Sequence, residues 1–134
     1  MAPYLADTSA WNRSAFAQEW WEALLEANEL ATCAPVRLEL LYSARSAHDY
    51  SELAYEYGRL PSLPLNKRVT AAAERTQAEL ASLGHHRGPS AVDLLVAAVA
   101  EVHGVTLLHH DRPFDAIARV TRQPAEWLPP RRVS

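Results

Sequence analysis

Two short apolar segments of this sequence each lead into a carboxylate, and this feature most limits the folds open to the chain. Asp7 follows the segment Tyr4–Ala6, and Asp111 follows residues 105–108 after two histidines. Short apolar runs bounded by polar residues are typical of buried strands. Because ligands of open α/β sheets bind beyond the carboxyl ends of the strands, Asp7 and Asp111 are candidate site residues. Asp7 has an equally good alternative interpretation as the N-cap of the next helix.

Segments with a helical spacing of apolar residues lie between and around these strands. The sequence predicts helices over residues 14–27, 34–44, 48–60, 67–83, 90–103 and 116–118. It also predicts strands over residues 30–33 and 124–128 and an extended segment over residues 61–65. This alternation predicts an α/β domain with a mostly parallel sheet, and the second and third helices form an αα-hairpin. Right-handed crossovers then bring the carboxyl ends of the strands to one edge.

Two of these helices carry further expectations about which side chains are buried. In the first helix the predicted buried stripe consists of Phe16, Trp20, Leu24 and Ala27. Trp11 and Trp21 lie outside that stripe, and large aromatic side chains that cannot face one core suggest a surface for a partner. The helix over residues 34–44 is apolar on almost every side, so we expect it to be buried on most sides.

Glu39 is a third candidate carboxylate, because it interrupts the apolar helix over residues 34–44. Removing a carboxylate from water without a partner is costly. Glu39 therefore needs a cation, a metal ion or an exposed position. Arg37 and Arg45 are near enough in the sequence to be the partner, so an ordinary ion pair stays open as an alternative.

Asp93 is a fourth candidate, at the third position of the helix that follows Ser90. Ser90 is a natural N-cap, and an acidic side chain at that position can satisfy the cap and the helix dipole. The capping box more often uses Glu or Gln there, which weakens the purely structural interpretation. Asp93 is therefore kept as both a cap residue and a site candidate.

The predicted topology brings all four of these carboxylates to one edge of the sheet: Asp7, Glu39, Asp93 and Asp111. Carboxylates that share a site raise one another's pKa, and a divalent cation relieves this repulsion. Mg²⁺ and Mn²⁺ prefer carboxylate and water oxygens. No His and Cys pattern typical of zinc accompanies these residues, and the single cysteine, Cys33, rules out a multi-cysteine zinc site.

Composition places the chain in a broad class. We expect residues 1–134 to form one domain, because 134 residues with 49% hydrophobic side chains can build a single core. The lone cysteine and the lack of a signal or membrane-spanning segment predict a soluble, cytoplasmic protein with no membrane partner. A net charge of −3 argues against nonspecific nucleic-acid binding by bulk charge. However, residues 67–134 carry more basic than acidic side chains, so a polyanionic partner stays open.

Four segments of the chain resemble, in order, the acidic motifs of the PIN domain. They are residues 5–9 around Asp7, 37–41 around Glu39, 90–98 around Asp93 and 107–114 around Asp111. In length and order the chain resembles the VapC-type toxins of toxin–antitoxin pairs. The resemblance implies a PIN-like three-layer α/β/α sandwich with a mostly parallel central sheet. It also implies an endoribonuclease that depends on Mg²⁺ or Mn²⁺, forms a homodimer and is blocked by a cognate antitoxin.

Carried over residue by residue, the resemblance makes Asp7 and Asp93 the central metal ligands, with Glu39 and Asp111 completing the acidic pocket. Thr8 or Ser9 would orient a carboxylate or a water within it. The chain departs from the family pattern at Pro113, where many relatives have an acidic or polar residue. Asp115 is therefore an alternative outer-shell group, and the sequence leaves open which of Asp111 and Asp115 reaches the metal.

Partners are also suggested by residues near these motifs. Arg13, Arg87 and Arg112 are candidates for steering the RNA backbone, because they lie close to the motifs in the sequence. Four aromatic residues are candidates for dimer or antitoxin contacts: Trp20, Trp21, Tyr50 and Tyr57.

Three other classes of protein are alternatives to the nuclease. A receiver-type signalling domain would need a late lysine, and no lysine follows Lys67. A phosphatase of the haloacid dehalogenase type would need a second Asp two positions after Asp7, where Ser9 stands. A catalytically silent PIN-like module that binds RNA or protein is the strongest alternative, because intact ligands do not by themselves prove turnover.

Overall fold

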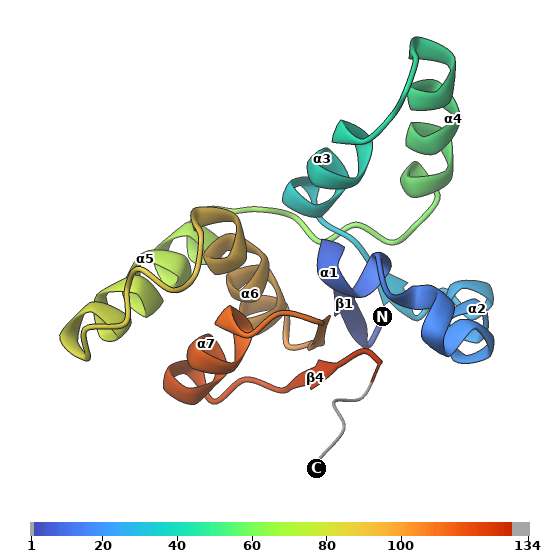
Figure 1. Cartoon of the computed structure of the whole chain (residues 1–134). Helices are drawn as coiled ribbons and strands as arrows, with labels where there is room; N and C mark the ends of the chain where they lie inside the picture. The colour runs from blue at the N-terminus through green and yellow to red at the C-terminus, as the bar shows by residue number, and fades with distance from the viewer. Residues whose placement is uncertain (1, 130–134) are drawn as a thin grey trace.

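The computed structural model describes residues 2–129 and builds them around a four-stranded sheet with helices on both faces (Figure 1). All neighbouring strands are parallel and follow the order β2–β1–β3–β4. Their bounds are β1 Tyr4–Ala6, β2 Leu30–Ala31, β3 Thr106–His109 and β4 Ala125–Trp127. Ala6 lies opposite Leu108, so β1 and β3 reach the same edge together. This is the α/β/α architecture that the sequence predicts.

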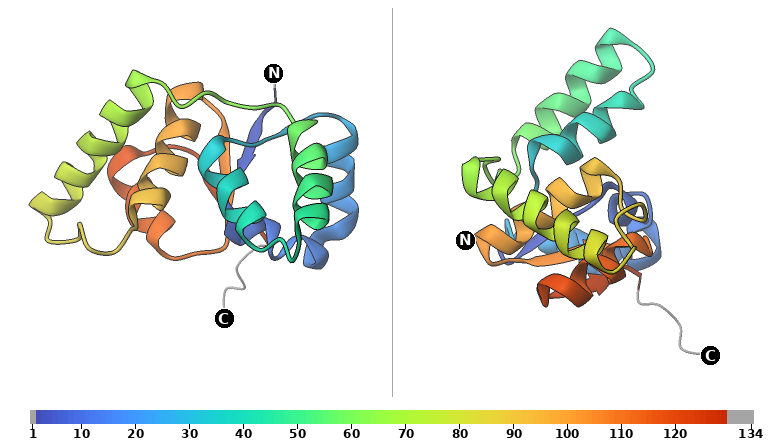
Figure 2. Two further views of the ribbon diagram at one scale, coloured as in Figure 1. Left: turned by 90° about the horizontal axis from the view of Figure 1, so that it is seen from above. Right: turned by 90° about the vertical axis from the view of Figure 1, so that its left-hand side faces the viewer.

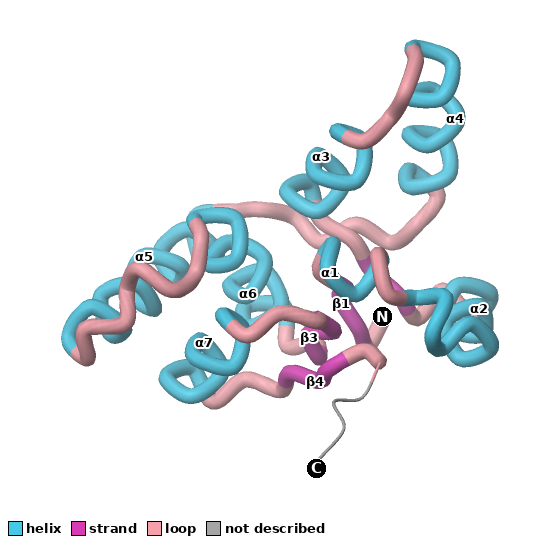
Figure 3. Tube along the Cα trace, viewed as in Figure 1, coloured by secondary structure: helices cyan, strands magenta, loops and turns pink. Residues whose placement is uncertain are grey.

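The helices agree with the predicted ones in most of their bounds (Figure 3). They are α1 Thr8–Trp11, the 3₁₀ turn η1 Ser14–Ala17, α2 Gln18–Glu26, α3 Ala34–Tyr42, α4 Ala47–Gly58, α5 Lys67–Ser82, α6 Ala91–His103 and α7 Pro113–Thr121. The short helix α1 is additional, and α7 is longer than the sequence suggests. Within residues 2–129, no helix is both long and apolar enough to cross a membrane.

The sheet separates two apolar clusters. Leu5 and Leu107 face a large cluster formed with α3, α5, α6 and α7, whereas Ala6 and Leu108 face a smaller cluster with α1 and α2. Successive strand residues point to opposite faces, so each strand supplies both clusters. The central residues of β1 and β3 are therefore apolar on both faces, as in other parallel sheets covered on both sides.

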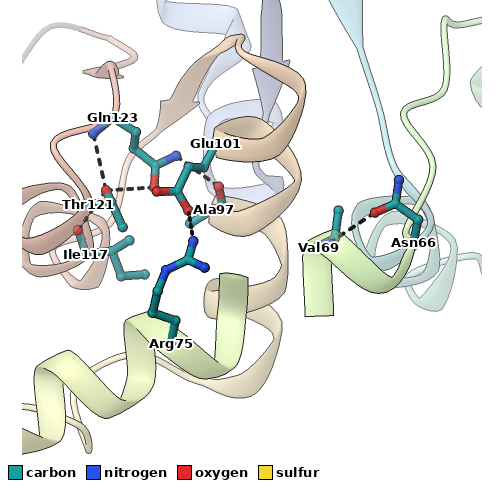
Figure 4. A network of polar contacts seen from close by, with 8 residues as sticks. All are labelled: Asn66, Val69, Arg75, Ala97, Glu101, Ile117, Thr121 and Gln123. Atoms are coloured by element: carbon teal, nitrogen blue, oxygen red, sulfur yellow. Dashed lines mark hydrogen bonds and ion pairs between the residues drawn. The ribbon is translucent and has the colours of Figure 1, made fainter. Parts of the chain in front are cut away.

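Polar contacts hold α5, α6 and α7 together at the end of α6 away from the sheet edge where β1 and β3 end (Figure 4). Gln123 is buried, and its side-chain amide donates to the carbonyl of Ala97 at 2.9 Å. Thr121 donates its hydroxyl to Oε1 of Gln123 at 2.9 Å. Arg75 and Glu101 form an ion pair at 3.7 Å between α5 and α6. These contacts fix α6, whose first turn carries Asp93.

The predicted buried stripe over residues 14–27 is confirmed only at Leu24, which is buried. Phe16 and Trp20 are 71% and 40% exposed and Ala27 is exposed, whereas Trp21, predicted to lie outside the stripe, is only 5% exposed. The 3₁₀ turn η1 precedes Gln18, and its three residues per turn break the helical spacing on which the stripe was based. Trp11 of α1 packs edge-to-face on Trp21 with ring centroids 4.7 Å apart, which brings Trp21 inward.

The expectation that residues 34–44 are buried on most sides is also wrong. Leu38 is 67% exposed and Tyr42 is 92% exposed. Helix α3 forms the predicted αα-hairpin with α4, and this hairpin projects from the rest of the domain (Figure 2). Only one side of α3 meets α1 and α6, so its apolar outer side faces solvent.

Residues 61–65 are extended as predicted but add no full strand. Thr32 and Ser62 form a single parallel bridge, with Thr32 N donating to the Pro61 carbonyl and Leu63 N donating to the Thr32 carbonyl. Prolines at positions 61 and 64 remove donors, which limits this segment to the edge of the sheet beyond β2.

Candidate acidic site

Asp7 is the most buried member of the acidic group, with only 5% of its surface exposed. It is the N-cap of α1, and its Oδ2 accepts hydrogen bonds from the backbone N of Ser9 at 3.0 Å and from Ser9 Oγ at 2.6 Å. The alternative interpretation of Asp7 as a helix N-cap is therefore confirmed. Capping alone does not require burial, however, since N-cap side chains are commonly exposed.

Ser9 connects the loops that follow β1 and β3. Its Oγ donates to Asp7 and accepts from the backbone N of His110 at 2.9 Å. The backbone N of Asp7 donates in turn to the Leu108 carbonyl at 2.8 Å. Because parallel pairing already aligns the two strand ends, these bonds fix the spacing between Asp7 and the segment that carries Asp111.

Glu39 lies near the same edge but is exposed. Its Oε1 accepts a hydrogen bond from Oγ1 of Thr8 at 2.8 Å, which ties α3 to the residue after Asp7. The arginine alternative is wrong, because Arg37 donates to Ser62 Oγ at 2.7 Å and no ion pair within residues 2–129 includes Glu39 or Arg45. Exposure to water accounts for the presence of this carboxylate in an apolar helix.

Asp93 forms a complete capping box with Ser90 at the start of α6. Its backbone N donates to Ser90 Oγ at 3.1 Å, and its Oδ2 accepts from the backbone N of Ser90 at 2.9 Å. The side chain is half-buried. The capping role predicted for Asp93 from the sequence is therefore confirmed.

The pKa values of Asp7 and Asp93 link all four carboxylates electrostatically. Burial is the main cause that raises the pKa of Asp7 above 3.8, with Ser9 hydrogen bonds opposing it and the charge of Glu39 adding to it. Burial also raises the pKa of Asp93, and the charges of Asp7 and Asp111 raise it further. Each buried carboxylate thus experiences the negative charge of others at this edge.

Asp111 and Asp115 differ in their surroundings. Asp111 is exposed at the end of the β3 loop, and its charge acts on Asp93. Asp115 accepts a hydrogen bond from Nε1 of Trp127 at 3.0 Å, because the first turn of α7 directs it toward β4. Geometry therefore favours Asp111 over Asp115 as the fourth member of the acidic group.

The acidic group contains no basic partner and no compact ligand set among the described residues. The ion pairs within residues 2–129 join His48 to Glu52 and Arg75 to Glu101, both outside this edge. In the same range, no three side chains of His, Cys, Asp or Glu stand close enough together to hold a metal ion. The described carboxylates therefore do not form the closed four-ligand set of a structural zinc site.

An exposed apolar groove adjoins the acidic group, and sequence reasoning missed it. Its volume is about 620 Å³, and Thr8 and Glu39 line it together with apolar side chains. These are Ala34, Pro35, Leu38, Tyr42, Leu65, Val92 and Leu95. The sequence feature that could have indicated this groove is that α3 is apolar on almost every side. The apolar residues on its outer side are uncovered and line the groove.

We expect the burial of Asp7 to make the metal-free protein less stable as pH rises. A raised folded-state pKa means that the folded state holds the proton more tightly than the unfolded state. The contribution of Asp7 to the free energy of unfolding therefore falls as pH rises from about 3.8, the unfolded-state pKa, through the higher folded-state pKa. Urea unfolding gives the free energy of unfolding of wild type and of Asp7→Asn between pH 3.5 and 7. As pH rises, the free energy of unfolding of wild type should fall relative to that of Asp7→Asn. A difference between the two proteins that stays constant with pH would contradict this prediction.

Comparison with known proteins gives a consistent result. Residues 4–120 match the PIN domain family. The chain is 41% identical over 132 residues to Ribonuclease VapC18 of Mycobacterium tuberculosis (strain ATCC 25618 / H37Rv), and the match covers 96% of each chain.

Solved structures share the fold at low sequence identity. DNA-bound VapBC from Salmonella typhimurium superimposes with a TM-score of 0.74 at 21% identity, covering 95% of this chain and 98% of that one. VapBC-5 from Mycobacterium tuberculosis, a member of the VapBC family of toxin–antitoxin systems, gives 0.63 at 20% identity, with coverage of 95% and 98%.

Proposed function

This chain belongs to the PIN domain family, and on that premise we propose that it is the endoribonuclease toxin of a toxin–antitoxin pair. Its reaction is the hydrolysis of RNA phosphodiester bonds, with Mg²⁺ held by carboxylates. The observation that carries the proposal is Asp7, buried beside like charges and without a basic partner within residues 2–129. Such an arrangement is unfavourable unless a cation joins it. The relatedness to Ribonuclease VapC18 supports the same activity.

The side chains at this edge suit a hard divalent cation. They offer carboxylate oxygens from Asp7, Glu39, Asp93 and Asp111, which are the donors that Mg²⁺ and Mn²⁺ prefer. Mg²⁺ keeps several waters and is commonly held by one or two carboxylates together with substrate phosphates. Carboxylates that do not form a compact ligand set by themselves are therefore compatible with Mg²⁺. We assign Asp7 and Asp93 as the residues that would hold it, with Glu39 and Asp111 completing the pocket. When bound, Mg²⁺ would polarise the phosphodiester and activate a water.

The protein's own residues orient these groups. Ser9 holds the Asp7 carboxylate and the β3 loop in one arrangement, and Thr8 holds Glu39 toward the same edge. The excess negative charge repels an RNA phosphate in the absence of a cation, so substrate binding and metal binding should be coupled. Arg13 and Arg87 lie near acidic motifs in the sequence and Arg112 lies within one, and all three are proposed to attract the RNA backbone.

The activity is tested by cleavage of defined RNAs with Mg²⁺, with Mn²⁺ and with a chelator. We expect cleavage with either ion and none with the chelator. Binding of RNA without cleavage under any metal condition would instead support the silent PIN-like module. Cleavage that persists with the chelator would contradict the metal-dependent mechanism.

The groove beside Glu39 supports the partner proposed for this protein, a cognate antitoxin. Leu38 and Tyr42 expose large apolar surfaces there, and Glu39 places a negative charge at the same cavity. A peptide segment that combines apolar side chains with a basic residue would cover the groove and block the acidic group. A homodimer is also proposed; of the aromatic candidates, Trp20 and Tyr50 are exposed, Tyr57 is half-buried, and Trp21 is buried and therefore excluded.

We expect Leu38→Glu to weaken antitoxin binding by about 10-fold or more, because it places a charge in the apolar part of the groove. The matched control is Tyr55→Glu, since Tyr55 is 71% exposed on α4 and does not line the groove. Binding of the proposed cognate antitoxin is measured by calorimetry with each variant. Equal affinities for Leu38→Glu and Tyr55→Glu would exclude this groove as the binding surface.

A further inference from the structure

His109 is buried at the last position of β3, and nothing in the proposed mechanism uses it. Its side chain is 1% exposed. The imidazole ring contacts two aromatic rings, with its centroid 5.1 Å from that of Phe114 and 5.0 Å from that of Trp127. These neighbours come from α7 and β4, so two separate elements pack against the ring.

The orientation of the ring matters because Nδ1 of His109 accepts a hydrogen bond from the backbone N of Asp111 at 3.3 Å. The carbonyl of Asp111 accepts from the backbone N of Phe114, also at 3.3 Å. An accepting Nδ1 carries no proton, so the neutral ring has its hydrogen on Nε2.

The backbone around Asp111 is thus held by hydrogen bonds to two side chains. Ser9 accepts from the backbone N of His110, and Ser9 also contacts Asp7. His109 Nδ1 accepts from the backbone N of Asp111, which is the residue after His110. Two consecutive amide groups are therefore fixed, one relative to Asp7 and one relative to β3. The side chain of Asp111 is exposed, and neither of its carboxylate oxygens accepts a hydrogen bond from residues 2–129, so its direction depends on this backbone.

We propose that His109 is a positioning residue: its Nδ1 holds the backbone of Asp111 and thereby directs the Asp111 carboxylate toward Asp93. The consequence for catalysis rests on the proposed nuclease function, but the positioning itself does not. A side chain of similar reach with an acceptor oxygen should replace His109, whereas an apolar side chain of similar size should not. This distinguishes positioning from simple filling of space.

Two variants separate these roles. His109→Leu removes the acceptor and keeps an apolar side chain in the core, and His109→Asn places an amide oxygen near the position of Nδ1. His103→Leu is the matched control, because His103 forms a hydrogen bond to the Pro64 carbonyl at the other end of α6. The three variants are compared with wild type by NMR and by RNA cleavage.

The first measurement does not depend on activity. Nitrogen-15 spectra of the wild-type histidine rings should show His109 with an unprotonated Nδ1, and hydrogen exchange of the Asp111 amide should accelerate about 10-fold in His109→Leu but not in His109→Asn or His103→Leu. A proton on Nδ1 of wild-type His109, or unchanged protection of the Asp111 amide in His109→Leu, would overturn the proposal.

The second measurement concerns turnover. With saturating Mg²⁺, kcat should fall about 10- to 100-fold in His109→Leu with little change in KM, and His109→Asn should restore most of it. Equal loss in His109→Leu and His109→Asn would overturn the positioning role. If the wild-type protein cleaves no RNA, the nuclease proposal fails, and the Asp111 amide exchange decides the positioning on its own.

Discussion

Asp7→Asn is expected to lower the rate of RNA cleavage by at least about 100-fold while the fold is retained. The amide of Asn can still accept the hydrogen bonds of Ser9, so α1 keeps its cap. It cannot supply the negative charge that a divalent cation requires. Mg²⁺ should accordingly raise the Tm of the wild-type protein, and this increase should be absent from the variant. Initial rates on one defined RNA and thermal denaturation with and without Mg²⁺ measure both effects.

The control for Asp7→Asn is Glu79→Gln, which removes one negative charge from an exposed position on α5. Its cleavage rate and its Mg²⁺-induced Tm shift should match those of wild type. Cleavage by Asp7→Asn within about 3-fold of wild type, at equal purity, would remove Asp7 from the mechanism.

Trp21→Ala is expected to destabilise the protein by about 3–5 kcal/mol, the range typical of a large aromatic side chain removed from a core. Trp21 is 5% exposed and packs with Leu24 and Leu30 under the sheet, with Trp11 edge-to-face against its ring. The variant leaves a cavity that the short helices α1 and α2 cannot close. Chemical denaturation followed by far-ultraviolet circular dichroism gives the free energy of unfolding.

Trp20→Ala is the matched comparison, because the residue is adjacent and of the same type but 40% exposed. Its ring contacts Tyr4 at a centroid distance of 5.6 Å, so we expect a loss of about 1 kcal/mol. Similar losses for the two variants would contradict the packing of α2. A larger loss of stability for Trp20→Ala than for Trp21→Ala would instead support the burial of Trp20 that the sequence predicted.

Local sequence signals were sufficient to predict most of the fold. The strands at Tyr4–Ala6 and Thr106–His109 are short apolar runs, and Ser46, Asn66 and Ser90 each cap the helix that follows. Parallel pairing then requires Asp7 and Asp111 to approach the same edge. These features depend on neighbours in the sequence, together with one topological rule, so they can be recognised without coordinates.

Features that depend on contacts between distant segments could not be predicted in the same way. The exposure of Tyr42 follows from the direction in which the α3–α4 hairpin leaves the domain. The burial of Trp21 depends on Trp11 and on the 3₁₀ turn before α2. The different surroundings of Asp111 and Asp115 depend on Trp127, which reaches Asp115 only because β4 pairs with β3. The hydrogen bond between His109 and Asp111 has no pattern in the sequence at all.

The central claim is that Asp7, Glu39, Asp93 and Asp111 together hold a divalent cation. Its most direct test is a crystal structure of the protein with Mn²⁺, in which anomalous scattering locates the ion. We expect an anomalous peak at the edge where β1 and β3 end, with carboxylate oxygens of Asp7 and Asp93 within about 2.2 Å of it. A fully occupied Mn²⁺ elsewhere, with no peak between Asp7 and Asp93, would contradict the account.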